Sequence, residues 1–253
     1  MMRFVAGCLA AVSLAVVTGC STTTGPLPAE SSPSGSPTVS VDPVTVIPRS
    51  GVIYLRAWAA TDVPTMIAAA VPGSPAWNFA QYWNDAYRAG RLDSGAGVVT
   101  VRPRWVSVQF GSDRYRFTGA QTGRDGRLVT WRSQPGGPLA DRVVAGEPAS
   151  VRVGRVRVTA RYQYVNGEGD LRVSLRIVAP APDDLAALRY QPGGRTATLG
   201  SQGTTGVITV KKGVNWAIAS VESAEPGGAL ALRTYDASGN TTGRGTLRLS
   251  AGR

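Results

Sequence analysis

The amino-acid sequence predicts an α+β protein in which a small domain of helices and antiparallel sheet precedes an all-β sandwich. Apolar residues recur at helical spacing before Gly90, and after Gly97 the period changes to two. The 31 glycines and 17 prolines indicate many short elements joined by turns. Hydrophobic residues make up 43% of the 253 residues, which is enough for a substantial core. Helices followed by antiparallel strands are typical of the α+β class.

Residues 1–19 are predicted to be a signal peptide. After a positive start, residues 4–17 are almost wholly apolar. This run is shorter than the roughly 20 residues of a membrane span, but it has the length of a signal-peptide core. Residues 17–20, Val-Thr-Gly-Cys, resemble the bacterial lipobox, in which an aliphatic residue and two small residues precede a cysteine. The resemblance implies cleavage between Gly19 and Cys20 and lipidation of Cys20 with diacylglycerol and palmitate; an ordinary secretory signal with an incidental cysteine is the alternative.

Residues 20–48 are predicted to be a disordered tether, because Ser, Thr, Pro and Gly dominate and large apolar groups are few. Cys8 lies in the apolar core and would be removed with it, so the mature chain would hold one cysteine, which is acylated. Neither an intrachain disulfide nor a thiolate metal site is then expected. We therefore expect the protein at the extracytoplasmic face of the cell membrane, anchored by its lipid.

Residues 49–145 are predicted to form the α+β domain. The stretch 50–71 is ambiguous between strand and helix, although Asp62 followed by Pro64 is typical of a helix start. A clearer helix begins at Pro75 after a Ser74 cap and ends at Gly90. Its apolar residues recur at spacings of three and four and predict one buried face, made of Ala76, Phe79, Ala80, Trp83, Ala86 and Tyr87.

Three antiparallel strands are predicted to follow this helix, over residues 98–110, 114–119 and 126–132, with a turn at 123–126. Residues 146–253 are then expected to be a second domain made only of strands. Seven strands at the spacing of a β-sandwich are predicted there, at 151–165, 170–180, 195–200, 206–210, 215–223, 229–236 and 245–250. Gly154 breaks the alternation of the first of them and suggests a β-bulge.

Three stretches together resemble a group of actinobacterial lipoproteins of unknown function. They are the residues Pro-Gly-Ser-Pro-Ala at 72–76, residues 113–131 and residues 153–180. The resemblance covers most of residues 50–253. It implies that the first half is similar to a reduced nuclear-transport-factor-two-like cone and the second half to an immunoglobulin-like sandwich. It carries no catalytic motif.

The residues that the chain lacks exclude several kinds of chemistry. Because there is no histidine, neither a Ser-His or Cys-His nucleophile pair nor a histidine metal site can form. Nucleophile-elbow, phosphate-loop and dinucleotide-binding motifs are also missing. Paired acids could still support glycoside hydrolysis, at Asp183 with Asp184, Glu222 with Glu225, and Glu168 with Asp170, but each pair falls in a predicted turn or loop. We expect no enzyme activity, no cofactor and no metal.

Tryptophans concentrate in the first half, which holds five of the six. Large aromatic residues efficiently fill the core of a small domain, and that is the simpler interpretation. The alternative is a pocket between the helices and a curved sheet, with an anionic or glycan ligand held by aromatic residues and arginines. Its candidate ligand-binding residues are Trp83, Trp105, Trp131, Arg104 and Arg116.

A strongly basic balance is the second functional indication. The formal net charge is +11, from 27 basic and 16 acidic residues, which favours contact with anions. Arg155, Arg157, Arg172 and Arg176 are expected on the outward side of two paired strands, where they would form one basic face. Such a face would either dock onto anionic lipid or wall polymer or simply keep the surface soluble.

Together these observations predict a lipid-anchored protein of the cell envelope that binds or scaffolds without catalysis at the outer face of the membrane. The alternative is a pocket protein that holds a small anionic or glycan ligand in the first domain. The expected partners are the membrane, through the lipid anchor, and an anionic wall polymer or another envelope protein. Nucleic acid is not expected, because the chain is placed outside the cell.

Overall fold

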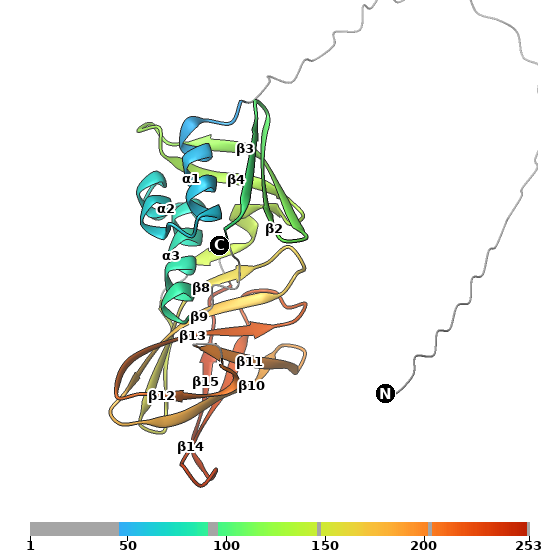
Figure 1. Ribbon diagram of the computed structural model, residues 1–253. Helices are drawn as coiled ribbons and strands as arrows, with labels where there is room; N and C mark the ends of the chain where they lie inside the picture. Colours follow the sequence, from blue (N-terminus) through green and yellow to red (C-terminus); the bar gives the residue numbers. More distant parts are fainter. Residues whose placement is uncertain (1–45, 91–95, 146–147, 202–203, 252–253) are drawn as a thin grey trace, which may run out of the picture. The chain divides into compact units, whose positions relative to one another are not determined.

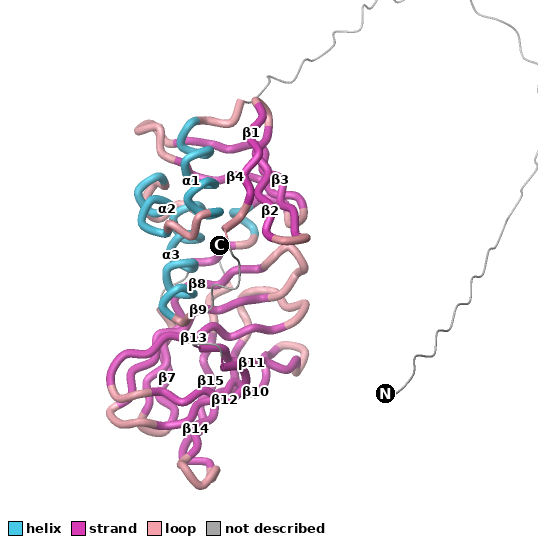
Figure 2. The backbone as a smooth tube through the Cα atoms, viewed as in Figure 1, coloured by secondary structure: helices cyan, strands magenta, loops and turns pink. Residues whose placement is uncertain are grey.

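The computed structural model describes residues 46–90, 96–145, 148–201 and 204–251, and these belong to one unit (Figure 1). The predicted signal peptide, Cys20 and nearly all of the predicted tether lie outside the described residues. The described residues are α+β and mostly β, with three short α-helices, a five-stranded sheet and a ten-stranded sheet (Figure 2). None of the helices in the described ranges is long and apolar enough to cross a membrane.

Helices form the first part of the fold: α1 spans Arg49–Ala59, α2 spans Val63–Ala69 and α3 spans Pro75–Arg88. The ambiguous stretch is therefore two helices. Both predicted caps are confirmed, since Asp62 accepts a hydrogen bond from the Thr65 backbone N–H and Ser74 accepts one from that of Trp77.

One residue predicted on the buried face of α3 is not buried. Tyr87 is 62% exposed, because the C-terminal half of α3 turns its buried side, with Tyr82 and Asp85, toward the larger sheet.

The smaller sheet has five antiparallel strands in chain order, β1 to β5. Their bounds are Val98–Arg102, Trp105–Phe110, Asp113–Thr122, Leu128–Gln134 and Gly137–Pro138. The single strand predicted over 98–110 is wrong: Arg102 pairs with Trp105, so Pro103 and Arg104 form a two-residue hairpin turn. Proline lacks the N–H that the hydrogen-bond ladder of a sheet needs. The apolar alternation continues on both sides of Pro103, however, and so the sequence does not show the turn. The other two predicted strands and the turn between them are confirmed.

The larger sheet has ten strands, β6 to β15, paired in the order β15-β14-β10-β12-β11-β13-β9-β8-β6, and β7 also pairs with β8. A short 3-10 helix, Leu139–Asp141, leads into it. The strand bounds are Val143–Ala145, Ser150–Val153, Val156–Val165, Leu171–Ala179, Asp183–Gln191, Arg195–Ser201, Thr204–Val210, Gly213–Val221, Ala229–Tyr235 and Thr241–Arg248. The first of these, β6, lies within residues 49–145, where the first domain is predicted. It nevertheless pairs with β8 of the larger sheet.

Two details of the larger sheet differ from the prediction. Gly154 is not a bulge, because Val153 pairs with Val156 and a two-residue turn separates β7 from β8. Its φ of +58° explains the glycine, since other residues rarely adopt that conformation. Asp183 and Asp184 begin the strand β10 rather than lying in a loop. Hydrophobic alternation misses this strand because Leu185, Ala186 and Ala187 are all buried.

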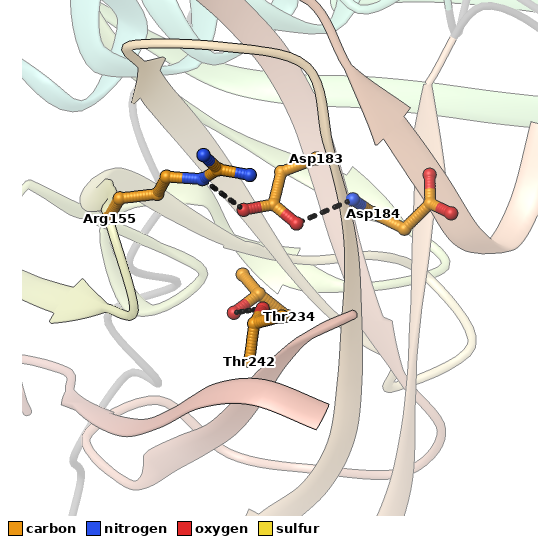
Figure 3. A network of polar contacts seen from close by, with 5 residues as sticks. All are labelled: Arg155, Asp183, Asp184, Thr234 and Thr242. Carbon is orange, nitrogen blue, oxygen red and sulfur yellow. Dashed lines mark hydrogen bonds and ion pairs between the residues drawn. The ribbon is translucent and has the colours of Figure 1, made fainter. Parts of the chain in front are cut away.

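The larger sheet curls back on itself to enclose one apolar core. Strand β7 contacts β15, although the two lie near opposite ends of the pairing order. At this closure the Arg155 guanidinium Nε lies 3.3 Å from an Asp183 carboxylate oxygen, and the Thr242 hydroxyl donates to that of Thr234 (Figure 3). The turn between β7 and β8 therefore packs against β10, β14 and β15.

Helix α3 joins the two parts of the fold. It packs against β4 and β6 and also against β8, β9 and β13, and Tyr82, Ala86, Tyr162 and Ile218 form an apolar cluster at this contact. Asp85, 1% exposed, lies within that contact.

Two polar networks hold the two parts of the fold together. Arg161 donates to one carboxylate oxygen of Asp85 at 2.9 Å, and the Ser174 hydroxyl donates to the other at 3.0 Å. The buried Arg142 donates to the Ser133 hydroxyl of β4, the Tyr164 hydroxyl of β8 and the Val165 carbonyl. Burial raises the pKa of Asp85 to about 6, against the lowering effects of Arg161 and of the Ser174 hydrogen bond.

Asp85 is expected to make the stability of the fold depend on pH. Its pKa of about 6 in the folded protein lies above the ordinary value of 3.8, so folding favours the protonated carboxyl. The stability that this group contributes is complete below about pH 4 and is lost as the pH rises through about 6. Relative to Asp85→Asn, the wild-type free energy of unfolding should fall by on the order of 3 kcal/mol from about pH 4 to about pH 7, measured by urea unfolding.

Ser174→Ala provides the matched comparison. Because the Ser174 hydrogen bond lowers the pKa of Asp85, its removal should move the transition to higher pH. Parallel pH profiles for wild type and Asp85→Asn would show that Asp85 does not titrate in this range.

Candidate functional site

An aromatic cavity of about 520 Å³ opens beside α3, where the turn between β2 and β3 faces strands β8, β9 and β13. We call it the aromatic cavity. Its volume lies in the range of roughly 300–1,000 Å³ that small-molecule pockets occupy. The aromatic side chains that line it come from helices and strands of both sheets and are Trp58, Tyr82, Trp83, Phe110, Tyr115 and Tyr164.

Ring contacts fix the cavity wall in place. Trp58 meets Trp83, Phe110 and Tyr115 edge to face, with centroids 6.1, 5.0 and 5.8 Å apart. Behind these rings it also contacts Phe79 and Phe117 of the core. Edge-to-face packing of this kind adds about 0.5–1.5 kcal/mol per pair. The wall is therefore formed before a ligand arrives.

Two side chains that line the cavity each have a buried N–H donor without a partner among the described residues. They are the Trp83 indole Nε1 and the Arg172 Nε. The Arg172 guanidinium also forms no ion pair with any described carboxylate. A buried donor left unsatisfied costs about 1–3 kcal/mol, and more when it is charged.

Tyr115 and Tyr164 of the cavity lining stay neutral, and Arg172 brings a positive charge to the lining. Burial raises the pKa of Tyr115, and the Asp113 and Glu168 carboxylates raise it further. Burial likewise raises the pKa of Tyr164, whose hydroxyl accepts a hydrogen bond from Arg142. Asp113 also lines the cavity, but it is exposed. The chemistry available is therefore apolar contact, hydrogen bonding and attraction of one anion to Arg172.

A second hollow, of about 460 Å³, lies on the outer side of β9, β13 and β11, and we call it the polar groove. Its lining is hydrophilic and includes Asp170, Arg195, Thr196, Thr198, Ser220 and Glu222. Arg172 lines both the polar groove and the aromatic cavity. Within the described residues, no group of three or more acidic or thiol side chains could hold a metal ion.

The five candidate ligand-binding residues lie in different environments. Trp83 lines the aromatic cavity. Trp131, 3% exposed, is packed in the core of the smaller sheet against Tyr54, Phe79 and Phe117. Trp105 is half-buried beneath the exposed Arg116, whose guanidinium lies 4.8 Å from the ring centroid, and Arg104 is exposed in the turn between β1 and β2. The structure thus brings only Trp83 to the cavity.

The four candidate surface arginines do not share one open face. Arg155 lies in the turn between β7 and β8 and pairs with Asp183. Arg157 is exposed on β8, opposite Val178 of β9. Arg172 lines the cavity, and Arg176, on the same strand, lies opposite Trp216 of β13. Between Arg172 and Arg176, α3 covers the strand, because Asp85 accepts the Ser174 hydrogen bond there.

In the part of the chain that the structure describes, neither hollow is lined by both members of an acid pair. Asp183 and Asp184 are consecutive in β10, so their side chains point to opposite sides of the strand. Asp183 pairs with Arg155, and Asp184 accepts a hydrogen bond from the Thr209 hydroxyl at 2.7 Å. In the turn between β8 and β9, the Asn166 side-chain amide donates to Glu168 and to Asp170.

Sequence reasoning missed several residues that line the aromatic cavity, including Trp58, Phe110, Tyr115 and Tyr164. Trp58 is one of the five tryptophans of the first half, and no feature of the neighbouring sequence marks it as a cavity residue. Tyr115 alternates with Arg114 and Arg116 in β3, a pattern that indicates a buried face but not a cavity. No protein-family model, curated protein or solved structure matches the chain.

Mutation of a core tryptophan is expected to cost more stability than mutation of a half-exposed one. Trp131→Ala should lower the free energy of unfolding by about 3–5 kcal/mol, because it empties a core site. Trp105→Ala should cost about 1 kcal/mol, since it removes a half-exposed ring and its contact with Arg116. Urea unfolding measures both changes, and equal costs would contradict the assignment.

Proposed function

We propose that this chain is a non-enzymatic, lipid-anchored binding protein of the cell envelope. Its aromatic cavity would hold a small molecule that has an apolar body and an anionic group. The single observation that supports this best is Arg172, which lines an aromatic wall and forms no ion pair with a described carboxylate. Trp83 lines the same cavity, and its buried indole N–H has no partner among the described residues.

The proposed binding mode divides the ligand into two parts. The apolar body packs against Trp58, Phe110 and Ile218, which removes apolar surface from water at about 25 cal/mol per Å². The anionic group accepts charge-assisted hydrogen bonds from Arg172, which are stronger and shorter than neutral ones. The exposed Asp113 on the cavity lining disfavours a second negative group at that end.

Anchoring at the membrane is the second part of the proposal. It rests on the lipobox-like residues 17–20 and on the Ser/Thr/Pro-rich composition of residues 20–48. A tether of that length would hold the cavity near the outer face of the membrane. The resemblance to actinobacterial lipoproteins agrees with this location.

An immunoglobulin-like sandwich for residues 146–253 belongs to the same proposal. It is supported by the antiparallel pairing throughout β6 to β15 and by the curling that brings β7 against β15. A single apolar core, with Val158, Leu175 and Leu232 among its buried members, lies inside this curl.

Binding of an anionic aromatic probe tests the cavity. The full chain in neutral phosphatidylcholine nanodiscs should bind 2-naphthalenesulfonate in isothermal titration calorimetry, with empty nanodiscs as the blank. Arg172→Gln should weaken binding by about 10- to 100-fold, the loss expected for a charge-assisted hydrogen bond. Trp83→Phe keeps an aromatic ring but removes the indole N–H and part of the ring surface, and it should cost about fivefold.

Arg176→Gln is the matched control, because Arg176 is on the same strand but faces Trp216 rather than either hollow. It should bind the probe as tightly as wild type. Absence of binding, or equal effects of Arg172→Gln and Arg176→Gln, would refute the cavity as the binding site.

Lipid attachment is tested by metabolic labelling with alkynyl palmitate in the native host. Cys20→Ser should abolish the label and release the protein from the membrane fraction, because Cys20 is the proposed acylated residue. Cys8→Ser, in the apolar core of the signal peptide, should keep both. Label that persists in Cys20→Ser would exclude anchoring at this residue.

A further inference from the structure

The aromatic cavity and the polar groove meet along one row of residues. Tyr164 of β8 pairs with Arg172 of β9, Arg172 pairs with Ser220 of β13, and Ser220 pairs with Thr198 of β11. Directly paired residues of neighbouring strands point to the same side of a sheet. With strands about 4.8 Å apart, this row of four is roughly 14 Å long. Its first member lines the aromatic cavity, and its last two line the polar groove.

Arg172 lies at the junction, since it lines both hollows. An anion bound to its guanidinium would therefore have the aromatic cavity on one side and the polar groove on the other. A carboxylate or sulfonate ends a molecule and carries a substituent on one side only. A phosphodiester keeps its negative charge while it is bonded on both sides, and the planar guanidinium fork matches phosphate oxygens.

The lining of the polar groove suits hydroxyl groups. Thr196, Thr198 and Ser220 carry hydroxyls that both donate and accept. Carboxylates of Asp170 and Glu222 accept from hydroxyls, and Arg195 donates. Apart from Arg172, the groove has two carboxylates and one guanidinium, and Arg195 already donates to the Glu222 backbone carbonyl at 3.0 Å. A second anionic group is therefore disfavoured there, and a hydroxylated group fits the hydroxyls and carboxylates of the lining.

We propose that the two hollows form one elongated site for an amphipathic phosphodiester. Its apolar part occupies the aromatic cavity, its phosphate binds Arg172, and a polyol or sugar headgroup fills the polar groove. This inference rests on the proposed binding function of the cavity and specifies its ligand class. The order of the three parts follows the row from Tyr164 to Thr198.

Three water-soluble dihexanoyl phospholipids test the headgroup position, with the full chain in neutral nanodiscs and empty nanodiscs as the blank. Phosphatidylglycerol has a phosphodiester and headgroup hydroxyls, phosphatidylmethanol has the same diester without hydroxyls, and phosphatidylcholine has a cationic headgroup. Calorimetry should show that phosphatidylglycerol binds about fivefold to tenfold more tightly than phosphatidylmethanol. Phosphatidylcholine, whose headgroup has no hydroxyl, should bind more weakly than phosphatidylglycerol.

The double variant Thr198→Val with Ser220→Ala should remove the advantage of phosphatidylglycerol while leaving phosphatidylmethanol unchanged. Thr246→Val, at an exposed position of β15 outside both hollows, is the control and should leave all affinities unchanged. Arg172→Gln should weaken both anionic ligands at least tenfold. Circular dichroism and urea unfolding check that each variant is folded.

The outcomes distinguish the two proposals. Equal affinities for phosphatidylglycerol and phosphatidylmethanol, both lost with Arg172→Gln, would overturn the elongated site and leave the cavity as a simpler anion site. Binding that ignores Arg172→Gln, or no binding of any probe, would overturn both. A preference for phosphatidylglycerol that survives the double variant would place the headgroup outside the polar groove and also overturn the inference.

Discussion

The buried carboxylate of Asp85 is the contact on which the functional part of the structure depends. It holds α3 against the larger sheet through Arg161 of β8 and Ser174 of β9. Removing a carboxylate from water costs several kcal/mol, so such a group persists only where its partners are well placed. Because α3 carries Trp83, this contact sets the distance between the aromatic wall and Arg172. Arg142 secures the other side, where β4 meets Tyr164 of β8.

This placement of α3 gives chemically equal side chains different environments. Arg172 and Arg176 are four residues apart on β9 and project from the same side of it, with Ser174 between them. The helix lies over Ser174, so Arg172 becomes part of a cavity lining while Arg176 remains beside Trp216. A charged row that would face water on a bare sheet is thereby divided. The functional difference between the two arginines comes from the covering helix and not from the strand.

The sequence predicts what is set by near neighbours. Asp62 and Ser74 cap their helices through residues three positions away, and most strands follow from alternation. The turn at Pro103 was hidden because alternation persists on both sides of it, and the consecutive buried residues of β10 do not alternate at all. The site was harder still: Asp85 and Ser174 are 89 residues apart, and no local pattern shows that they meet. The sequence marks Trp83 as an aromatic residue and places Arg172 on a surface, but no pattern in it shows that the two line one cavity.

Arg172 also links binding to stability. A folded protein can lower its free energy by pairing a buried charged group or by exposing it to water. The Arg172 Nε is buried and has no hydrogen-bond partner within the described residues. The cost of leaving it unsatisfied is borne by the unliganded fold and is recovered when an acceptor binds. Any ligand that binds only the folded state stabilises it by mass action. In the proposed function, the same residue would weaken the empty protein and select its ligand, which is what a binding site built on a preformed aromatic wall requires.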